Sequence, residues 1–397
     1  MSDIIDAAAI SAWAWRTPLG SGERVLPRLL AGERAARPNA RFDTTSYAAS
    51  LGCAILQPQQ THRKRRFLRR MGCYALEVAH EAYAAWQASQ AGEGAGQAGE
   101  RIGLFFGYGG LRAHWDELMP AFERQTAEGE GAWQRGLTLL HPHWMLQHLS
   151  NNAHAVAAQE LGARGEGATF GGANAGAQAL SAALRSLAAG AVDVALVVAY
   201  DSLNEPETLV ELAQRHLLNC HAGDFAAPYD RAAQGFVPGE AAAALVLQRR
   251  ADAKQPLGYL DACDGADGEN GVASCATLAR LAASLAQAGD AVDGAGMAQA
   301  GYDLAEREAL ARVVGADAPL TCVSSALGHC GAASAVVQSI ALLQCLQQQV
   351  LTPIADLQHA SPGPLQAVLD ARHFVGQAAI GLSTGTPGLA GVIRVAL

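Results

Sequence analysis

Two helices of small, uncharged residues constrain the fold more than any other feature of this sequence. One opens at residues 176–180 (GAQAL) and the other at residues 331–335 (GAASA), each after a glycine-bearing turn. Small side chains let a second backbone approach a helix closely. We therefore expect both helices to lie deep between layers, one from each half of a duplicated fold. In a chain this rich in alanine the echo can also arise by chance, and the sequence alone leaves both explanations open.

Short apolar runs alternate with helical patterns along the rest of the chain. The apolar runs predict buried strands at 102–106, 192–199, 242–247, 320–323 and 378–382. The helical patterns lie at 71–88, 175–189, 304–314 and 331–348. Glycine-rich or polar stretches near 92–96 and 264–268 indicate loops. Alternation of this kind favours an α/β fold in which helices cover the sheets.

Composition narrows the class of protein and of partner. Half of the 397 residues are hydrophobic and 16% are charged, which is typical of a compact protein with much buried surface, part of it available for an oligomer interface. The net charge of -9 argues against nucleic acid or an anionic membrane as the main partner. No signal peptide is recognisable and no apolar run is long enough for a membrane span, so we expect a cytoplasmic protein.

The eight cysteines are scattered along the chain and form no CxxC pair. This spacing argues against both a zinc site and a disulfide framework. We expect the cysteines to be reduced and many of them to be buried. We expect neither a metal nor a cofactor.

Several motifs together resemble one family. Residues 228–231 (PYDR) and 234–242 (QGFVPGEAA) resemble the long signature of β-ketoacyl synthases, and residues 327–333 (LGHCGAA) resemble their "GHxxGAAG" turn. Residues 16–20 (RTPLG) and 191–195 (AVDVA) match two shorter motifs of the same family. The resemblance runs from about residue 8 to the C-terminus. It implies the thiolase fold, in which duplicated βαβαβαββ halves form a five-layer αβαβα sandwich, here divided into residues 1–248 and 249–397.

The resemblance also implies a catalytic site, and most of that site is missing. A working synthase of this family uses a cysteine at a helix N-terminus, two histidines and a nearby lysine; the helix dipole favours the thiolate. Matched position by position, the cysteine corresponds to Ala173, the first histidine to Ala295 and the lysine to Ser324, so that only His329 remains. The loop that gates the site is replaced by residues 384–388 (TGTPG).

Three losses together favour a protein that is inactive by nature over a single engineered knockout. The chain resembles the cysteine-less chain-length-factor subunit of type II polyketide systems, and within that group the subunits of aryl polyene systems. The resemblance implies a heterodimer with a cysteine-bearing ketosynthase, an acyl carrier protein with an acidic surface as a further partner, and control of chain length by the shape of the acyl tunnel.

The same resemblance names candidates for binding. Tyr108, Leu111 and Trp115 follow a predicted strand and are candidates to close the tunnel, although ordinary packing explains each equally well. In the basic run at 63–70, Arg65, Arg66 and Arg69 are candidates to contact the carrier protein, or else they form a solvated helix start.

Two questions stay open at this stage. His329 is either a remnant that binds the pantetheine arm of a carrier protein or a structural histidine bonded within its turn. The chain itself is either a non-catalytic partner or a β-ketoacyl synthase with an altered or mutated site, in which His329 acts with Asp303 or with a displaced cysteine such as Cys330.

Overall fold

The chain folds as two similar halves. The computed structural model describes residues 7–59, 65–90, 99–110, 117–120, 123, 137–220, 226–268 and 271–397. Its first half consists, in order, of β1 (Ala8–Thr17), α2 (Arg70–Gln90), β5 (Ile102–Tyr108), α6 (Asn152–Leu161), β6 (Ala168–Gly171), α7 (Ala175–Ala188), β7 (Val194–Ser202) and β8 (Glu240–Gln248). The second consists of β9 (Gly258–Ala266), α9 (Cys275–Leu285), β10 (Ala291–Asp293), α10 (Ala300–Val314), β11 (Pro319–Thr321), α12 (Ser334–Gln347), β15 (Ala378–Gly385) and β16 (Leu389–Ala396). Both halves therefore follow the pattern βαβαβαββ.

The strands of the two halves are arranged in the same order. The first half-sheet runs β6-β5-β7-β8-β1 and the second runs β11-β10-β15-β16-β9. In each, three strands are parallel and the last two are antiparallel to their neighbours. Short antiparallel pairing between Ala8–Ile10 of β1 and Gly258–Leu260 of β9 joins the half-sheets. This repeated order confirms the predicted duplication.

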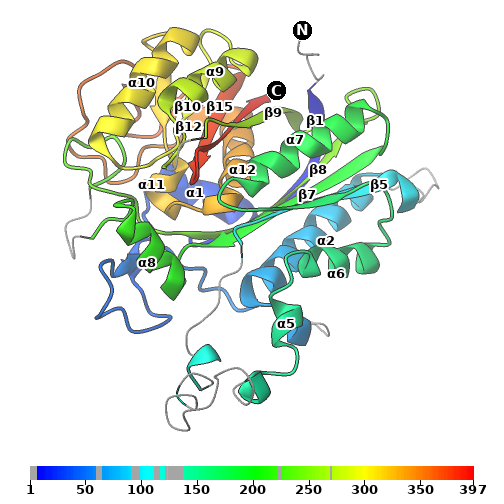
Figure 1. The fold of residues 1–397 in the computed structure, drawn as a ribbon. Coiled ribbons are helices and arrows are strands. Elements are labelled where there is room, and N and C mark those ends of the chain that lie inside the picture. The colour runs from blue at the N-terminus through cyan, green and yellow to red at the C-terminus, as the bar shows by residue number, and fades with distance from the viewer. Residues whose placement is uncertain are drawn as a thin grey trace.

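Five layers are visible in Figure 1. From upper left to lower right they are α9 with α10, the second half-sheet, α7 with α12, the first half-sheet, and α2 with α6. Three hydrophobic clusters fill the spaces between them: one around α7 and α12, one beneath α9 and α10, and one beneath α2 and α6. The thiolase fold and its αβαβα sandwich are thus confirmed.

The two small-residue helices form the central layer, as the sequence predicts. α7 and α12 contact one another and both half-sheets. A side chain at Gly176 would collide with the carbonyl oxygen of Ala332, which precedes α12. Glycine at this position therefore lets the two segments approach to backbone contact.

One local prediction was wrong. Residues 264–266 were expected in a loop, but they complete β9, where Asp264 pairs with Gly391 of β16. The predicted loop at 92–96 lies outside the described residues. The division of the chain into domains at residue 248 stays a prediction. No helix in the described ranges is long and apolar enough to cross a membrane.

Candidate functional site

Ala173 lies in the tight turn between β6 and α7, one residue before Asn174 at the start of the helix. Its half-buried side chain faces a cavity of about 170 Å³. Gly385 at the end of β15 packs against Ala173, so both halves of the fold contribute to this wall. The residues 384–386, predicted to replace the family's gating loop, also line this smaller cavity.

His329 lines the same cavity, and its ring contacts two neighbouring residues. The imidazole stacks on Phe236 with ring centroids 4.5 Å apart. Its Nδ1 accepts a hydrogen bond from the N–H of Gly331 at 3.1 Å. Burial lowers the pKa of His329 to about 4, and the nearby backbone of Thr384 opposes this shift. The ring is therefore neutral, with its Nδ1 bonded within its own turn.

Ala295 and Ser324 lie behind this cavity and do not line it. Ala295 follows β10 and is buried, and its N–H donates to Oε1 of Glu306 at 3.2 Å. Ser324 lies on the short helix α11 (Val323–Leu327), with its Oγ 3.1 Å from the sulfur of Cys322. Met297, two residues after Ala295, supplies the cavity wall instead. The structure thus brings Ala173 and His329 together and leaves the other two positions one layer back.

Three buried carboxyl groups surround the Ala295 segment. Asp293 ends β10, while Asp303 and Glu306 lie on α10. Burial raises their pKa values to about 7, 6 and 8 respectively. Each has one oxygen without a hydrogen-bond partner in the described part of the chain. The three carboxyl groups therefore titrate in the neutral range instead of near pH 4.

A larger cavity of about 680 Å³ lies beside the smaller one. Its walls include Tyr108 at the end of β5 and Tyr200 in β7, whose rings are 6.2 Å apart. Gly109 lines both cavities. A side chain at Gly109 would collide with the carboxylate of Asp201, so only a thin wall separates them.

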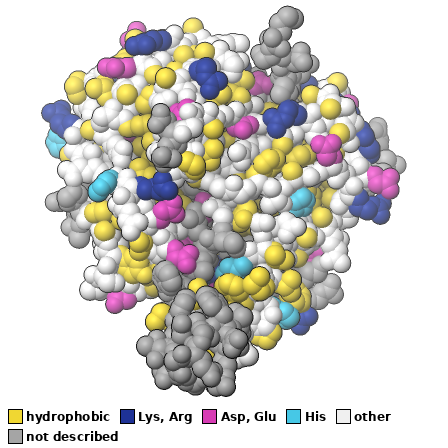
Figure 2. All heavy atoms as spheres, in the orientation of Figure 1, with side chains coloured by type: hydrophobic (Ala, Val, Ile, Leu, Met, Phe, Trp, Pro, Cys, Tyr) yellow, Lys and Arg dark blue, Asp and Glu magenta, His cyan; other side chains and the backbone are white. Residues whose placement is uncertain are grey.

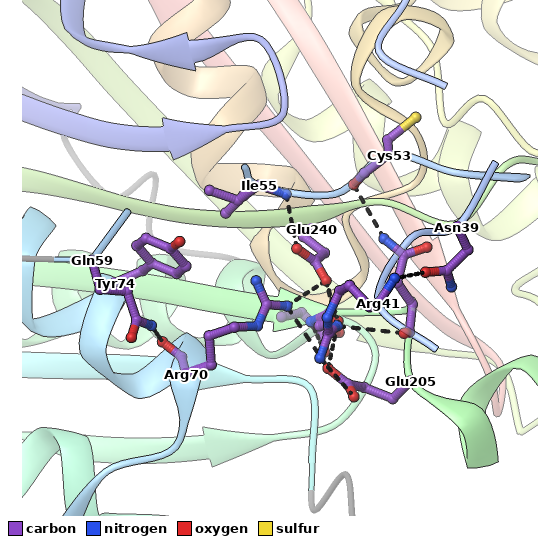
Figure 3. Close-up of polar contacts among 12 residues, drawn as sticks. Asn39, Arg41, Cys53, Ile55, Gln59, Arg70, Tyr74, Glu205 and Glu240 are labelled. Atoms are coloured by element: carbon purple, nitrogen blue, oxygen red, sulfur yellow. Dashed lines mark hydrogen bonds and ion pairs between the residues drawn. The ribbon is translucent and has the colours of Figure 1, made fainter. Parts of the chain in front are cut away.

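A network of two arginines and two glutamates forms one wall of the larger cavity (Figure 3). Glu240 at the start of β8 is fully buried and accepts hydrogen bonds from Arg41 at 2.7 Å, from Arg70, from Ser202 at 2.9 Å and from the N–H of Ile55 at 2.9 Å. Arg41 also pairs with Glu205 at 2.8 Å. Two positive and two negative charges therefore cancel in this wall.

The structure brings only some of the predicted binding residues together. Arg66 is exposed, whereas Arg69 is already paired with Glu117 at 2.8 Å and lies 2.5 Å from Nε2 of His148 at the larger cavity. Of the tunnel candidates, Tyr108 lines this cavity, while Leu111 and Trp115 lie outside the described residues, as does the side chain of Arg65. No motif in the sequence marks Arg41 or Tyr200, and Arg70 belongs to the basic run but was not among its candidates for binding.

The alternative nucleophiles are poorly placed. The thiol of Cys330 is buried and donates to the carbonyl of Gly328, and burial raises its pKa strongly. Asp303 accepts from the N–H of Tyr229 at 2.8 Å. Neither residue lines the smaller cavity, and no cysteine is among its lining residues in the described ranges. The described residues also contain no group of three potential metal ligands.

Comparison of the sequence with models of protein families finds matches to the two domains of one family. Residues 9–253 match the family model "Beta-ketoacyl synthase, N-terminal domain", and residues 265–358 match "Beta-ketoacyl synthase, C-terminal domain". No curated protein sequence matches the chain significantly.

Several solved structures share the fold along almost the whole chain. A β-ketoacyl synthase from Burkholderia phymatum STM815 superposes with a TM-score of 0.85 at 20% identity, covering 98% of this chain and 99% of that one. The ishigamide ketosynthase/chain length factor gives 0.84 at 20% identity, with 98% of each chain covered. The ketosynthase complex AntDE:AntF, described as a type II PKS acyl-carrier protein with its ketosynthase bound to the hexaketide, gives 0.82 at 18% identity, covering 98% and 99%.

Proposed function

Because this chain belongs to the β-ketoacyl synthase family, we propose that it is a subunit of the chain-length-factor type, without condensing activity of its own. It pairs with an active, cysteine-bearing β-ketoacyl synthase and shapes the acyl tunnel during chain elongation. An aryl polyene or related polyketide pathway is the setting we favour. In this proposal, the turn that holds Ala173 and the cavity of about 170 Å³ beside it are a degenerate form of the family's catalytic site.

The observation that carries this proposal is the methyl group of Ala173 at the start of α7. A methyl group cannot form the thioester on which a condensation begins. His329, the one retained catalytic residue, is neutral, and its Nδ1 accepts a hydrogen bond from the N–H of Gly331. Ala295 and Ser324 supply neither an acid–base group nor a cation. The fold is kept while the chemistry is not, which supports a role in assembly.

Two features of the surface support the proposal that this chain binds a protein partner. Strand β6 pairs with β5 on one side only among the described strands, and its residues 168–170 are half-exposed. An unpaired edge of this kind is a template for pairing with another chain. Nearby, large hydrophobic side chains are exposed on and beside α5 (Trp144–Gln147), where Figure 2 shows hydrophobic atoms gathered at the surface. They are Leu139, Met145, Leu146 and Leu149.

We assign the larger cavity to the acyl tunnel and the exposed Arg66, with Arg65, to contact with an acidic carrier protein. Tyr108 lies where the two cavities meet and is the residue we expect to limit chain length. A bulky side chain across a narrow tunnel stops elongation by overlap, which costs on the order of 1–3 kcal/mol per clash. The solved AntDE:AntF complex contains both a ketosynthase and a carrier protein, in keeping with this arrangement.

Co-expression with the cysteine-bearing ketosynthase of the same organism tests the proposal. We expect a stable heterodimer by size-exclusion chromatography, with elongation by the pair and none by this chain alone. Mass spectrometry after incubation with acyl carrier protein should find no covalent acyl adduct on this chain. A well-behaved monomer that acquires an acyl adduct would instead make it a synthase with an altered site.

A further inference from the structure

The larger cavity differs from a plain hydrocarbon tunnel in its two free phenols. Tyr108 and Tyr200 both line it, and neither hydroxyl has a hydrogen-bond partner within the described part of the chain. Three other tyrosines of the interior each donate a hydrogen bond: Tyr74 to Gln57, Tyr229 to Glu306 and Tyr302 to Ala273. Each of the two cavity phenols can donate and accept a hydrogen bond when a ligand arrives.

Most of the charged side chains around the cavity are paired, whereas Arg66, which also lines it, lies over the ring of Phe67 and pairs with no carboxylate in the described part of the chain. Arg41 and Arg70 face Glu205 and Glu240, and Arg69 faces Glu117. The carboxylate of Asp201 accepts from the N–H groups of Ser202 at 2.8 Å and Ala332 at 3.0 Å. A charged ligand group entering here would find no uncompensated counter-charge in these pairs, so its desolvation would not be offset.

The phenol of Tyr200 stays neutral. Burial raises the pKa of Tyr200, and the nearby Tyr108 and Asp201 raise it further. A neutral phenol beside paired ions suits a neutral oxygen-bearing group, which can exchange a hydrogen bond with it.

Resting on the proposed function, we propose that Tyr108 and Tyr200 select acyl chains whose far end carries a neutral hydrogen-bonding oxygen, such as a hydroxyl or carbonyl. The chain grows on the partner's nucleophile, and its far end reaches the larger cavity. A methyl-ended chain of the same length leaves both phenols unpaired, and a site built to hydrogen-bond a group rejects the analogue that lacks it.

The test uses the purified heterodimer and three carrier-bound acyl chains of equal length, ending in a hydroxyl, a methyl or a carboxylate group. We expect the hydroxyl-ended chain to be elongated roughly five- to tenfold faster than the methyl-ended one, and faster than the carboxylate-ended one. Tyr108→Phe and Tyr200→Phe should each reduce the hydroxyl preference, and the double variant should abolish it. The variants should raise KM for the hydroxyl-ended chain.

Tyr83→Phe is the matched control, because it removes a hydroxyl from α2 at a residue that does not line the cavity. It should keep the preference, and thermal unfolding should verify that all variants fold. A heterodimer that elongates all three chains equally, or prefers the carboxylate, overturns this inference and leaves the proposed function intact. Failure to form a heterodimer overturns both.

Discussion

At the scale of single residues, the proposed loss of the site involves more than one position. In the proposed match Ala173 stands at the position of the nucleophile, and Nδ1 of His329 is bonded within its own turn. Met297 fills the wall in front of Ala295. The positions of the lost residues are coupled, because each was useful only with the others in place.

Ala173→Cys is therefore expected to restore no elongation. The new thiol would gain the helix N-terminus, but Ala295 and Ser324 would still leave it without the second histidine and the lysine of the family's site. The readout is product formation from malonyl carrier protein by the variant alone, with iodoacetamide labelling to show that the thiol is present. Turnover by the variant would mean that Ala295 and Ser324 are wrongly matched.

At the scale of elements, the Arg41–Glu240 network fastens the loop before β4 (Leu51–Gly52), the start of α2, the start of β8 and the segment before α8 (Pro206–Gln214). These segments are far apart in sequence, and Figure 3 shows their side chains converging on Glu240. The network lies at one wall of the larger cavity, so the same ion pairs that hold the elements also shape that cavity.

We expect Arg41→Met to lower the free energy of unfolding by roughly 3 kcal/mol, because a buried carboxylate loses one of its two cations. Chemical denaturation measures the change. Arg28→Met is the control: Arg28 and Glu33 are both substantially exposed, and such a pair contributes only about 0–1 kcal/mol. Equal effects of the two substitutions would contradict the importance of the network.

The elements could largely be predicted from the sequence, whereas the network could not. Apolar runs and small-residue helices are local signals, and they indicated β5, β7, β8, α7 and α12 close to their observed positions. The end of β9 was missed because its polar residues are strand only through pairing with β16, more than a hundred residues later. Ala173 and His329 were found by motif, but Tyr200 and Arg41 carry no motif, and only the fold brings them to one cavity.

At the scale of the whole molecule, the buried carboxyls couple stability to pH. The pKa of Glu306 is raised from its usual 4.5 to about 8, and that of Asp293 from 3.8 to about 7, in both cases by burial. The folded state therefore holds protons that the unfolded chain releases. Their contribution to stability is fully present below about pH 4 and is lost as the pH rises through 7 to 8.

We expect the free energy of unfolding to fall by on the order of 3 kcal/mol between pH 5 and pH 9. Denaturation at a series of pH values checks this. Glu306→Gln removes one titrating group, keeps a polar side chain of the same shape and should flatten the slope. An unchanged slope in that variant would show that Glu306 is ionised in the folded protein.

The join between the half-sheets has a consequence for synthesis on the ribosome. β1 is made well before its long neighbours β8 and β9, which end at Gln248 and Ala266. At typical rates of about 5–20 residues per second, the two neighbours follow β1 only after tens of seconds. Ile10 and Trp15, fully buried in the folded protein, lie on this strand, so we expect them to be targets for chaperones during that interval.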